Sequence, residues 1–270
     1  MTSRSIALYG QVLKVGLQGT LVYRWNFLIR CVGSFLPLLC SMFLWGAVFE
    51  NKETFGNYTY AMMISYFMLI MILDSLTSPT EDDFQIANEI KDGLINQVLL
   101  KPLDYFTYRL TLYISARSAY IAVAAIPLLI LSLLLTDYLK AIPFAQTALP
   151  AIVAVIGSAL LQFLMTYTTA MLAFWLLDIG SVVFIVYSVE YLAGGHIFPL
   201  DVLSTQLYSV CMALPFAYQY YFPVAVCMGT LKGDAMMYGF MMQWFWIIFF
   251  YLFAQAMWRR GLRAYTAVGG

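Results

Sequence analysis

DDFQIANEIKDGLINQVLLKPLD, residues 82–104, is a long polar stretch in a chain that is otherwise strongly apolar. Of the 270 residues, 63% are hydrophobic and 10% are charged, and the mean hydropathy is +0.81. A soluble domain cannot bury that much apolar surface, so the composition indicates a membrane protein. The polar stretch must then lie outside the bilayer and connect two spans.

Apolar segments on both sides of this stretch are long enough to be membrane spans. A helix needs about 20 mainly apolar residues to cross roughly 30 Å of hydrocarbon. We predict six spans, at residues 25–48, 59–79, 112–136, 149–176, 180–198 and 235–258. The expected fold is an all-α polytopic membrane protein with a single transmembrane domain over residues 1–270. Little chain remains for a soluble catalytic or nucleotide-binding domain.

The basic residues are distributed unevenly between the two sides of these spans. An even number of spans puts both termini on one side, and that side also carries residues 80–110. Its basic residues are Arg4, Lys14, Arg24, Lys91, Lys101, Arg109, Arg259, Arg260 and Arg263, whereas the other side has Lys52, Lys140 and Lys232. Cytosolic loops are enriched in Lys and Arg, so both termini are predicted to be cytosolic.

The segment before the first span is amphipathic. Ile6, Tyr9, Leu13, Leu17 and Leu21 recur every three or four residues, and basic residues lie elsewhere around the helix. This pattern predicts a helix within residues 1–24 that lies flat in the cytosolic interface of the membrane. The alternative is a helix packed on neighbouring loops.

The polar stretch itself has helical spacing. The acids Glu81, Asp82 and Asp83 suit the start of a helix, where backbone N–H groups favour negative charge. An apolar stripe follows at Ala87, Ile90, Leu94 and Val98, with Glu89, Lys91, Asp92 and Asn96 facing elsewhere. We predict one helix over residues 82–100 whose apolar stripe is covered by the membrane or by protein. The alternative is a solvated loop helix without a partner.

The third and fourth spans are rich in Leu, Ile and Ala, which favours lipid-facing, structural helices. Between the fifth and sixth spans, residues 199–233 are apolar but interrupted by Pro199, Pro215 and Pro223. We expect half-helices that dip back into the outer leaflet and are covered by protein. Cys211 and Cys227 fall on this side, and their spacing does not decide whether they pair.

Glu190 is an acid well within a predicted span, and intramembrane acids are costly. Tyr187, Glu190, Tyr191 and Gly194 share one helix face and form a candidate path for an amphiphilic or cationic substrate. Alternatively, Glu190 lies near the outer interface and hydrogen-bonds a tyrosine or the re-entrant backbone. Asp74, near the inner end of the second span, is interpreted as a polar helix terminus.

Motifs for most soluble chemistry are missing from the sequence. It contains no G-x-x-x-x-G-K-[ST], so the chain cannot hydrolyse ATP with a P-loop. His196 is the one histidine, which argues against multi-histidine metal sites. We expect no metal or cofactor in the chain itself.

Two motifs and the topology together resemble a type-2 ABC transporter permease of the compact six-span branch. The first motif runs from Glu89-Ile90-Lys91-Asp92-Gly93-Leu94 to Leu99-Leu100-Lys101-Pro102-Leu103-Asp104. The second is Gly194-Gly195-His196-Ile197-Phe198-Pro199-Leu200, which follows the fifth span. The three acids at 81–83 depart from the pattern of the branch.

The resemblance implies an export subunit without a motor of its own, in a bacterial cytoplasmic (inner) membrane. Two cytosolic ABC ATPase subunits would bind ATP and Mg²⁺ and grip the coupling segment. Two permeases, identical or different, would pair among membrane lipids, and no nucleic-acid partner is expected. The coupling residues would be Glu89, Ile90, Lys91, Asp92, Gly93 and Leu94. The outer gate, or re-entrant motif, would contain Gly194, Gly195, His196, Phe198 and Pro199.

Other functions remain open from the sequence. A secondary carrier or channel would need ionisable residues along several spans or an inverted repeat. An intramembrane lipid-modifying enzyme would need clustered His, Asp or Ser, and a scaffold for other membrane proteins is a further alternative. The composition suits lipid-like, glycan or drug-like substrates equally.

Overall fold

The computed structural model describes residues 3–22, 25, 29, 32–33, 35–77, 82–140 and 142–265. Over these ranges the chain is helical, without a β-strand. The longer helices are α1 (Ser3–Val22), α3 (Phe35–Phe49), α4 (Tyr60–Thr77), α7 (Tyr105–Leu134), α9 (Phe144–Ala170), α10 (Gly180–Ala193) and α13 (Gly233–Ala264). The shorter ones are α5 (Asp82–Lys91), α6 (Ile95–Leu99), α8 (Thr136–Leu139), α11 (Thr205–Ala213) and α12 (Tyr221–Cys227). Three 3₁₀ turns are η1 (Met171–Phe174), η2 (Leu200–Val202) and η3 (Pro215–Tyr218).

The all-α polytopic membrane fold is confirmed. In the described chain, four helical segments, built on α4, α7, α9 and α13, are long and apolar enough to cross a membrane. The predicted first and fifth spans contain shorter apolar helices, α3 and α10, of 15 and 14 residues. At about 1.5 Å per residue, each is shorter than roughly 30 Å of hydrocarbon.

Some sequence assignments lie outside the described residues. They concern Arg24, just before the first predicted span, and Glu81, just after the second. The side chains of residues 3–7 and 20–22 on α1 are likewise not described. Within the described part, α1 packs along α7, where Ser115 Oγ donates to the carbonyl of Leu13 at 3.0 Å.

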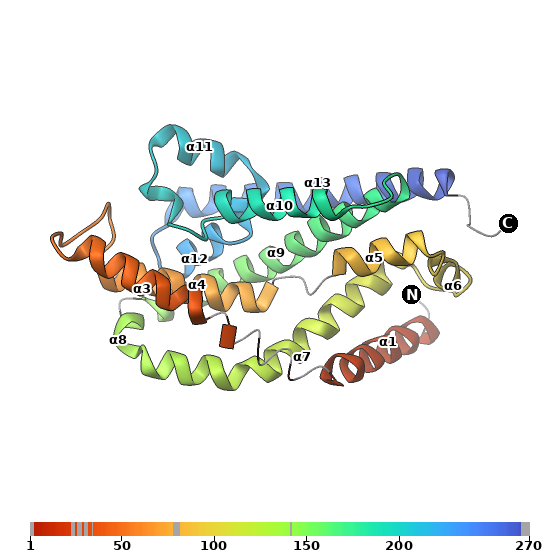
Figure 1. The fold of residues 1–270 in the computed structure, drawn as a ribbon, viewed down its shortest axis with the longest axis horizontal. Coiled ribbons are helices and arrows are strands. Elements are labelled where there is room, and N and C mark those ends of the chain that lie inside the picture. The colour runs from red at the N-terminus through yellow and green to blue at the C-terminus, as the bar shows by residue number, and fades with distance from the viewer. Residues whose placement is uncertain are drawn as a thin grey trace.

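The helices form an elongated bundle (Figure 1). α9 and α13 contact each other along its length, and α1 lines α7 at one edge. α5, α6 and the C-terminal end of α13 lie at one end, while α8 and α11 lie toward the other. The predicted cytosolic segment 80–110 and the predicted outer segment 199–233 therefore lie toward opposite ends of the bundle.

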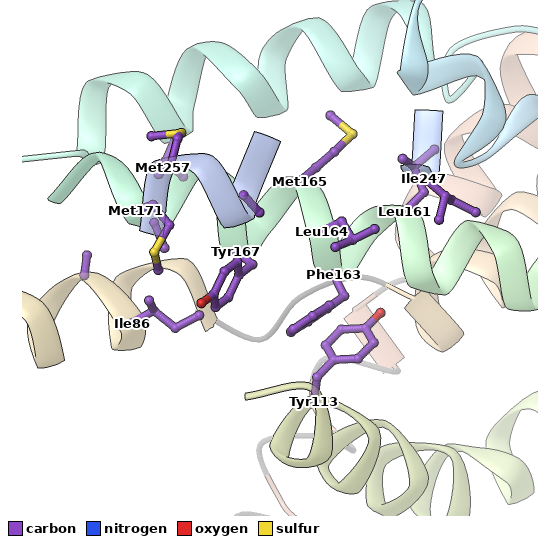
Figure 2. Packing of buried hydrophobic residues seen from close by; sticks show 14 of the residues in the cluster. Ile86, Tyr113, Leu161, Phe163, Leu164, Met165, Tyr167, Met171, Ile247 and Met257 are labelled. Atoms are coloured by element: carbon purple, nitrogen blue, oxygen red, sulfur yellow. The ribbon is translucent and has the colours of Figure 1, made fainter. Parts of the chain in front are cut away.

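α9 is the central helix, contrary to the prediction of a lipid-facing fourth span. Leu161, Phe163, Leu164 and Tyr167 on this helix are at most 2% exposed. Figure 2 shows these residues between Tyr113 of α7, Ile86 of α5 and residues of α13. Composition is misleading here because a core helix in a membrane bundle is as apolar as a lipid-facing one. Small residues with little exposed surface, Ala154, Ser158 and Ala170, permit the close contacts.

The predicted helix over residues 82–100 is wrong in one respect, because it is two helices. Gly93 separates α5 from α6 and has a φ of 73°, a conformation open to glycine but strained for other residues. The break redirects Leu94, which is 46% exposed although the helical stripe predicted it to be buried. Ala87, Ile90 and Val98 are buried as the stripe predicts.

The proline-rich segment 199–233 is broken into short helices. α11 and the η3–α12 stretch meet at a bend of 81°. α12 is enclosed by the bundle and contacts α9 and α4. Cys211 and Cys227 are free thiols in this segment, so they do not form the disulfide that was left open.

Gly239 of α13 makes room for α12, because a Cβ there would overlap the ring of Phe222. We predict that Gly239→Ala lowers thermal stability in detergent by about 1–3 kcal/mol, the usual cost of overpacking a core. Gly19→Ala on α1 is the matched control, since a Cβ at that position meets nothing within 4 Å. Equal melting temperatures of the two variants would show that this packing contact is misplaced.

Candidate functional site

Glu89, a predicted coupling residue, is bound within its own chain. Its Oε2 lies 2.6 Å from Nη2 of Arg109 and accepts a hydrogen bond from the Tyr105 hydroxyl at 2.8 Å. The side chain of Arg109 is only 5% exposed, against 24% for Glu89. Trp258 of α13 stacks on Tyr105 with ring centroids 4.7 Å apart, which covers the ion pair. The glutamate therefore holds α5 to the first turns of α7.

The two acids at the start of α5 also face the bundle. Asp82 Oδ2 lies 3.6 Å from Nη2 of Arg117 on α7. Asp83 is 2% exposed, and its Oδ2 accepts a hydrogen bond from the Tyr187 hydroxyl on α10 at 2.8 Å. Asp82 and Asp83, two of the three acids that depart from the pattern of the branch, thus contact α7 and α10.

The remaining predicted coupling residues differ in exposure. Ile90 is buried, Lys91 and Gly93 are half-buried, and Asp92 and Leu94 are exposed. Next to them an exposed surface continues over α6 to Lys101. We call this surface the α5–α6 face, and it consists of Asn88, Asp92, Leu94, Leu99, Leu100 and Lys101. Leu100 is 88% exposed, which is costly for an apolar side chain in water.

A cavity of about 460 Å³ lies between α3, α4 and the segment after α10. Its walls are mainly apolar and aromatic, with Trp45 and Phe67 among them, and its polar groups include Ser41, Asp74 and His196. The lining also includes Pro37, Leu38, Cys40, Leu44, Ile70, Met71, Tyr191 and Ile197. Asp74 is thus part of a cavity wall rather than simply a polar helix terminus.

The predicted path residues do not share one environment. Tyr191 lines the cavity and stacks on His196, with ring centroids 5.0 Å apart. Glu190 faces the protein interior, is 7% exposed and lies within hydrogen-bonding reach of Tyr220 and Gln162. Tyr187 points to Asp83, as described above.

The Gly-Gly turn after α10 is tied to two other helices. Tyr66 of α4 donates to the Gly195 carbonyl at 2.6 Å, and the Tyr221 N–H donates to the Gly194 carbonyl at 2.9 Å. Gly195 has a φ of 94°, and a Cβ there would overlap the Tyr66 hydroxyl. Glycine is therefore required by both conformation and space.

Phe198 packs against the core cluster around α4, and Pro199 is buried immediately before η2. After them, Asp201 accepts hydrogen bonds from the Tyr58 hydroxyl at 2.9 and 3.1 Å. Burial raises the pKa of Asp201, and the hydrogen bond from Tyr58 opposes this. Sequence reasoning missed the pair because the two residues are 143 positions apart.

Among the residues that the structure describes, no three His, Cys, Asp or Glu side chains are grouped to hold a metal ion. Two other features of the structure, the cavity and the α5–α6 face, suit the binding of other molecules. An open, mainly apolar cavity with few polar groups suits an amphiphilic molecule. The α5–α6 face suits a protein partner, because apolar and charged side chains are exposed side by side.

The ion pair on α5 allows a direct test of its structural role. We predict that Glu89→Gln lowers thermal stability by about 2 kcal/mol, because it leaves the buried Arg109 charge without its carboxylate. Asp92→Asn on the same helix should change stability by less than about 0.5 kcal/mol, since Asp92 is exposed.

The double variant Glu89→Gln/Arg109→Met should regain much of the lost stability, because no buried charge remains. Melting temperatures of the purified protein in detergent measure all three effects. If the Glu89→Gln and Asp92→Asn variants have equal melting temperatures, the ion pair contributes nothing to the stability of the fold.

Comparison with known proteins identifies the family. The model of a family described as ABC-2 family transporter protein matches residues 35–269. No curated protein matches the chain. The match covers most of the chain, including α4 to α13, the α5–α6 face and the cavity. The chain therefore belongs to the ABC-2 family of transporter proteins.

Proposed function

We propose that this permease is the membrane subunit of an ATP-driven exporter and exports an amphiphilic molecule. In this proposal two separate ABC ATPase subunits bind ATP and Mg²⁺, and the chain itself holds no cofactor. The α5–α6 face and both termini are cytosolic, in a bacterial inner membrane. The observation that carries the proposal is an exposed, partly apolar surface at one end of a transporter-family bundle.

The α5–α6 face is the docking surface for an ATPase subunit. Leu94, Leu99 and Leu100 are exposed beside Asp92 and Lys101. Burying apolar surface contributes about 25 cal/mol per Å², so a partner that covers the leucines gains stability. Charges at the rim set the orientation and speed of association more than its strength.

A second permease covers the apolar faces of α3 and α10. Phe43 and Phe184 are 80% and 73% exposed, and Leu36 and Leu192 add to these faces. Side chains of this kind suit either lipid or another copy of a membrane protein. The pairing of two permeases, identical or different, follows from the family rather than from the exposure.

The cavity of about 460 Å³ is the site for the exported molecule. Its volume lies within the range of small-molecule sites, and its few polar groups would orient a polar head while the aromatic walls hold an apolar body. Because Asp74, Ser41 and His196 lie on different elements, a movement of α4 against α3 would change their spacing. Alternating access then needs no other binding site in the described region.

Asp92 provides the test of docking, since its carboxylate is exposed on the α5–α6 face. We predict that Asp92→Lys reduces the amount of co-purified P-loop ATPase about five- to tenfold, equivalent to ~1–1.4 kcal/mol of binding free energy. Asp137→Lys, an equal charge reversal far from the α5–α6 face, should leave assembly unchanged. Wild-type amounts of ATPase with Asp92→Lys would contradict docking at this surface.

The cavity can be tested by site-specific crosslinking. With p-benzoylphenylalanine at Met71, which lines the cavity, illumination of cells should attach an amphiphilic compound that mass spectrometry detects on the purified chain. The control position is Leu133 on α7, which is 74% exposed and expected to face lipid. Recovery of the same phospholipids at both positions would count against a dedicated site.

A further inference from the structure

Tyr187 connects the docking segment to the fifth span. Its hydroxyl donates to Asp83 Oδ2 at 2.8 Å, and Asp83 is 2% exposed. The other acids of α5 bind elsewhere, since Asp82 and Glu89 both pair with arginines of α7. In the described part of the chain, this is the one side-chain hydrogen bond between α5 and α10.

A small polar cavity extends this connection into the bundle. It has a volume of about 10 Å³, close to the least that one water molecule requires. Its lining includes Asp83, Tyr187 and Glu190, together with Gln162 and Thr166 of α9. The Thr166 hydroxyl is buried there, within hydrogen-bonding reach of Tyr187. Polar groups from α5, α9 and α10 thus converge at one point inside an otherwise apolar protein.

The polar groups continue from Glu190 to the large cavity. Tyr220 lies within hydrogen-bonding reach of Glu190, and its hydroxyl donates to Asp74 Oδ1 at 3.3 Å. Asp74 lines the large cavity. A sequence of neighbouring buried and half-buried side chains therefore runs from the cavity to α5, through Asp74, Tyr220, Glu190, Tyr187 and Asp83.

We infer that the Asp83–Tyr187 hydrogen bond is a positioning contact that makes α5 and α10 move as one body. The inference rests on the proposed function, because it concerns how movement of the docking segment reaches the cavity. Without this bond, α5 stays attached to α7 through its two ion pairs but loses its polar connection to α10. Rotation of the docking segment then no longer carries α10 and the Gly194–Gly195 turn with it.

The inference can be tested by measuring distances within the assembled transporter. Nitroxide labels are attached to cysteines at Gln85, an exposed position of α5 outside the α5–α6 face, and at Ser181 at the exposed start of α10, in a chain lacking its natural cysteines. Dilution with unlabelled chain restricts the signal to pairs within one molecule. Pulsed electron paramagnetic resonance then gives the label distance in the reconstituted complex, without nucleotide and after trapping with ATP, Mg²⁺ and vanadate.

In the unsubstituted labelled chain we expect the same Gln85–Ser181 distance in both states. Tyr187→Phe removes only the hydroxyl, and trapping should then change this distance by several ångströms or broaden its distribution. Asp83→Ala should have the same effect. The double variant should have no larger effect, because both substitutions remove the same hydrogen bond between Tyr187 and Asp83. Tyr191→Phe is the matched control on the same helix and should keep the original behaviour.

A second label pair, Gln85 and Asp137, reports whether trapping moves α5 at all. If that distance does not change, or if Tyr187→Phe keeps both Gln85–Ser181 distributions of the parent chain, the inference is overturned. It is equally overturned if the parent chain already shows the change expected of Tyr187→Phe. Failure of any ATPase subunit to assemble with the parent chain would instead refute the proposed function.

Discussion

Main-chain groups that lie in apolar surroundings must find their hydrogen-bond partners inside the protein. The η3–α12 stretch illustrates this constraint, because its helices are short and most of its residues are buried within the bundle. Gln243 of α13 donates to the carbonyls of Ala154 and Tyr218 at 3.0 Å each. On α9, the Ser158 hydroxyl donates to the main-chain carbonyl of Gln219, and the Gln162 side chain accepts a hydrogen bond from the side-chain amide of Gln219.

Much of the candidate site depends on this interior scaffold. With the η3–α12 stretch fixed, Tyr220 lies between Glu190 and Asp74, and the Tyr221 N–H holds the carbonyl of Gly194. The cavity wall near His196 is therefore formed by a turn whose position is fixed by hydrogen bonds to α4 and α12. The polar residues within the spans serve first to keep broken helices in place.

Composition and the length of the apolar segments predicted the membrane class and the all-α fold, whereas the transporter family was predicted from the resemblance of two motifs and the topology. Periodicity also located the buried side of α5, since Ala87 and Ile90 lie where helical spacing places them. It failed at Gly93, because periodicity carries no information about a glycine with positive φ. The helix start at Tyr105 was missed as well, since its first turns are held by contacts rather than by apolar sequence. Partners such as Asp83 and Tyr187 are 104 positions apart, and no local pattern relates them.

The break at Gly93 separates α5 and α6, which have different roles although they are close in sequence. Before it, acidic side chains hold the stretch to α7 and α10, and after it, leucines are exposed at the end of the bundle. Changes in α6 can accumulate over evolution without disturbing the ion pairs of α5. Under the docking proposed above, such a transporter would be matched to a different motor by altering a few leucines, while its membrane body is inherited unchanged.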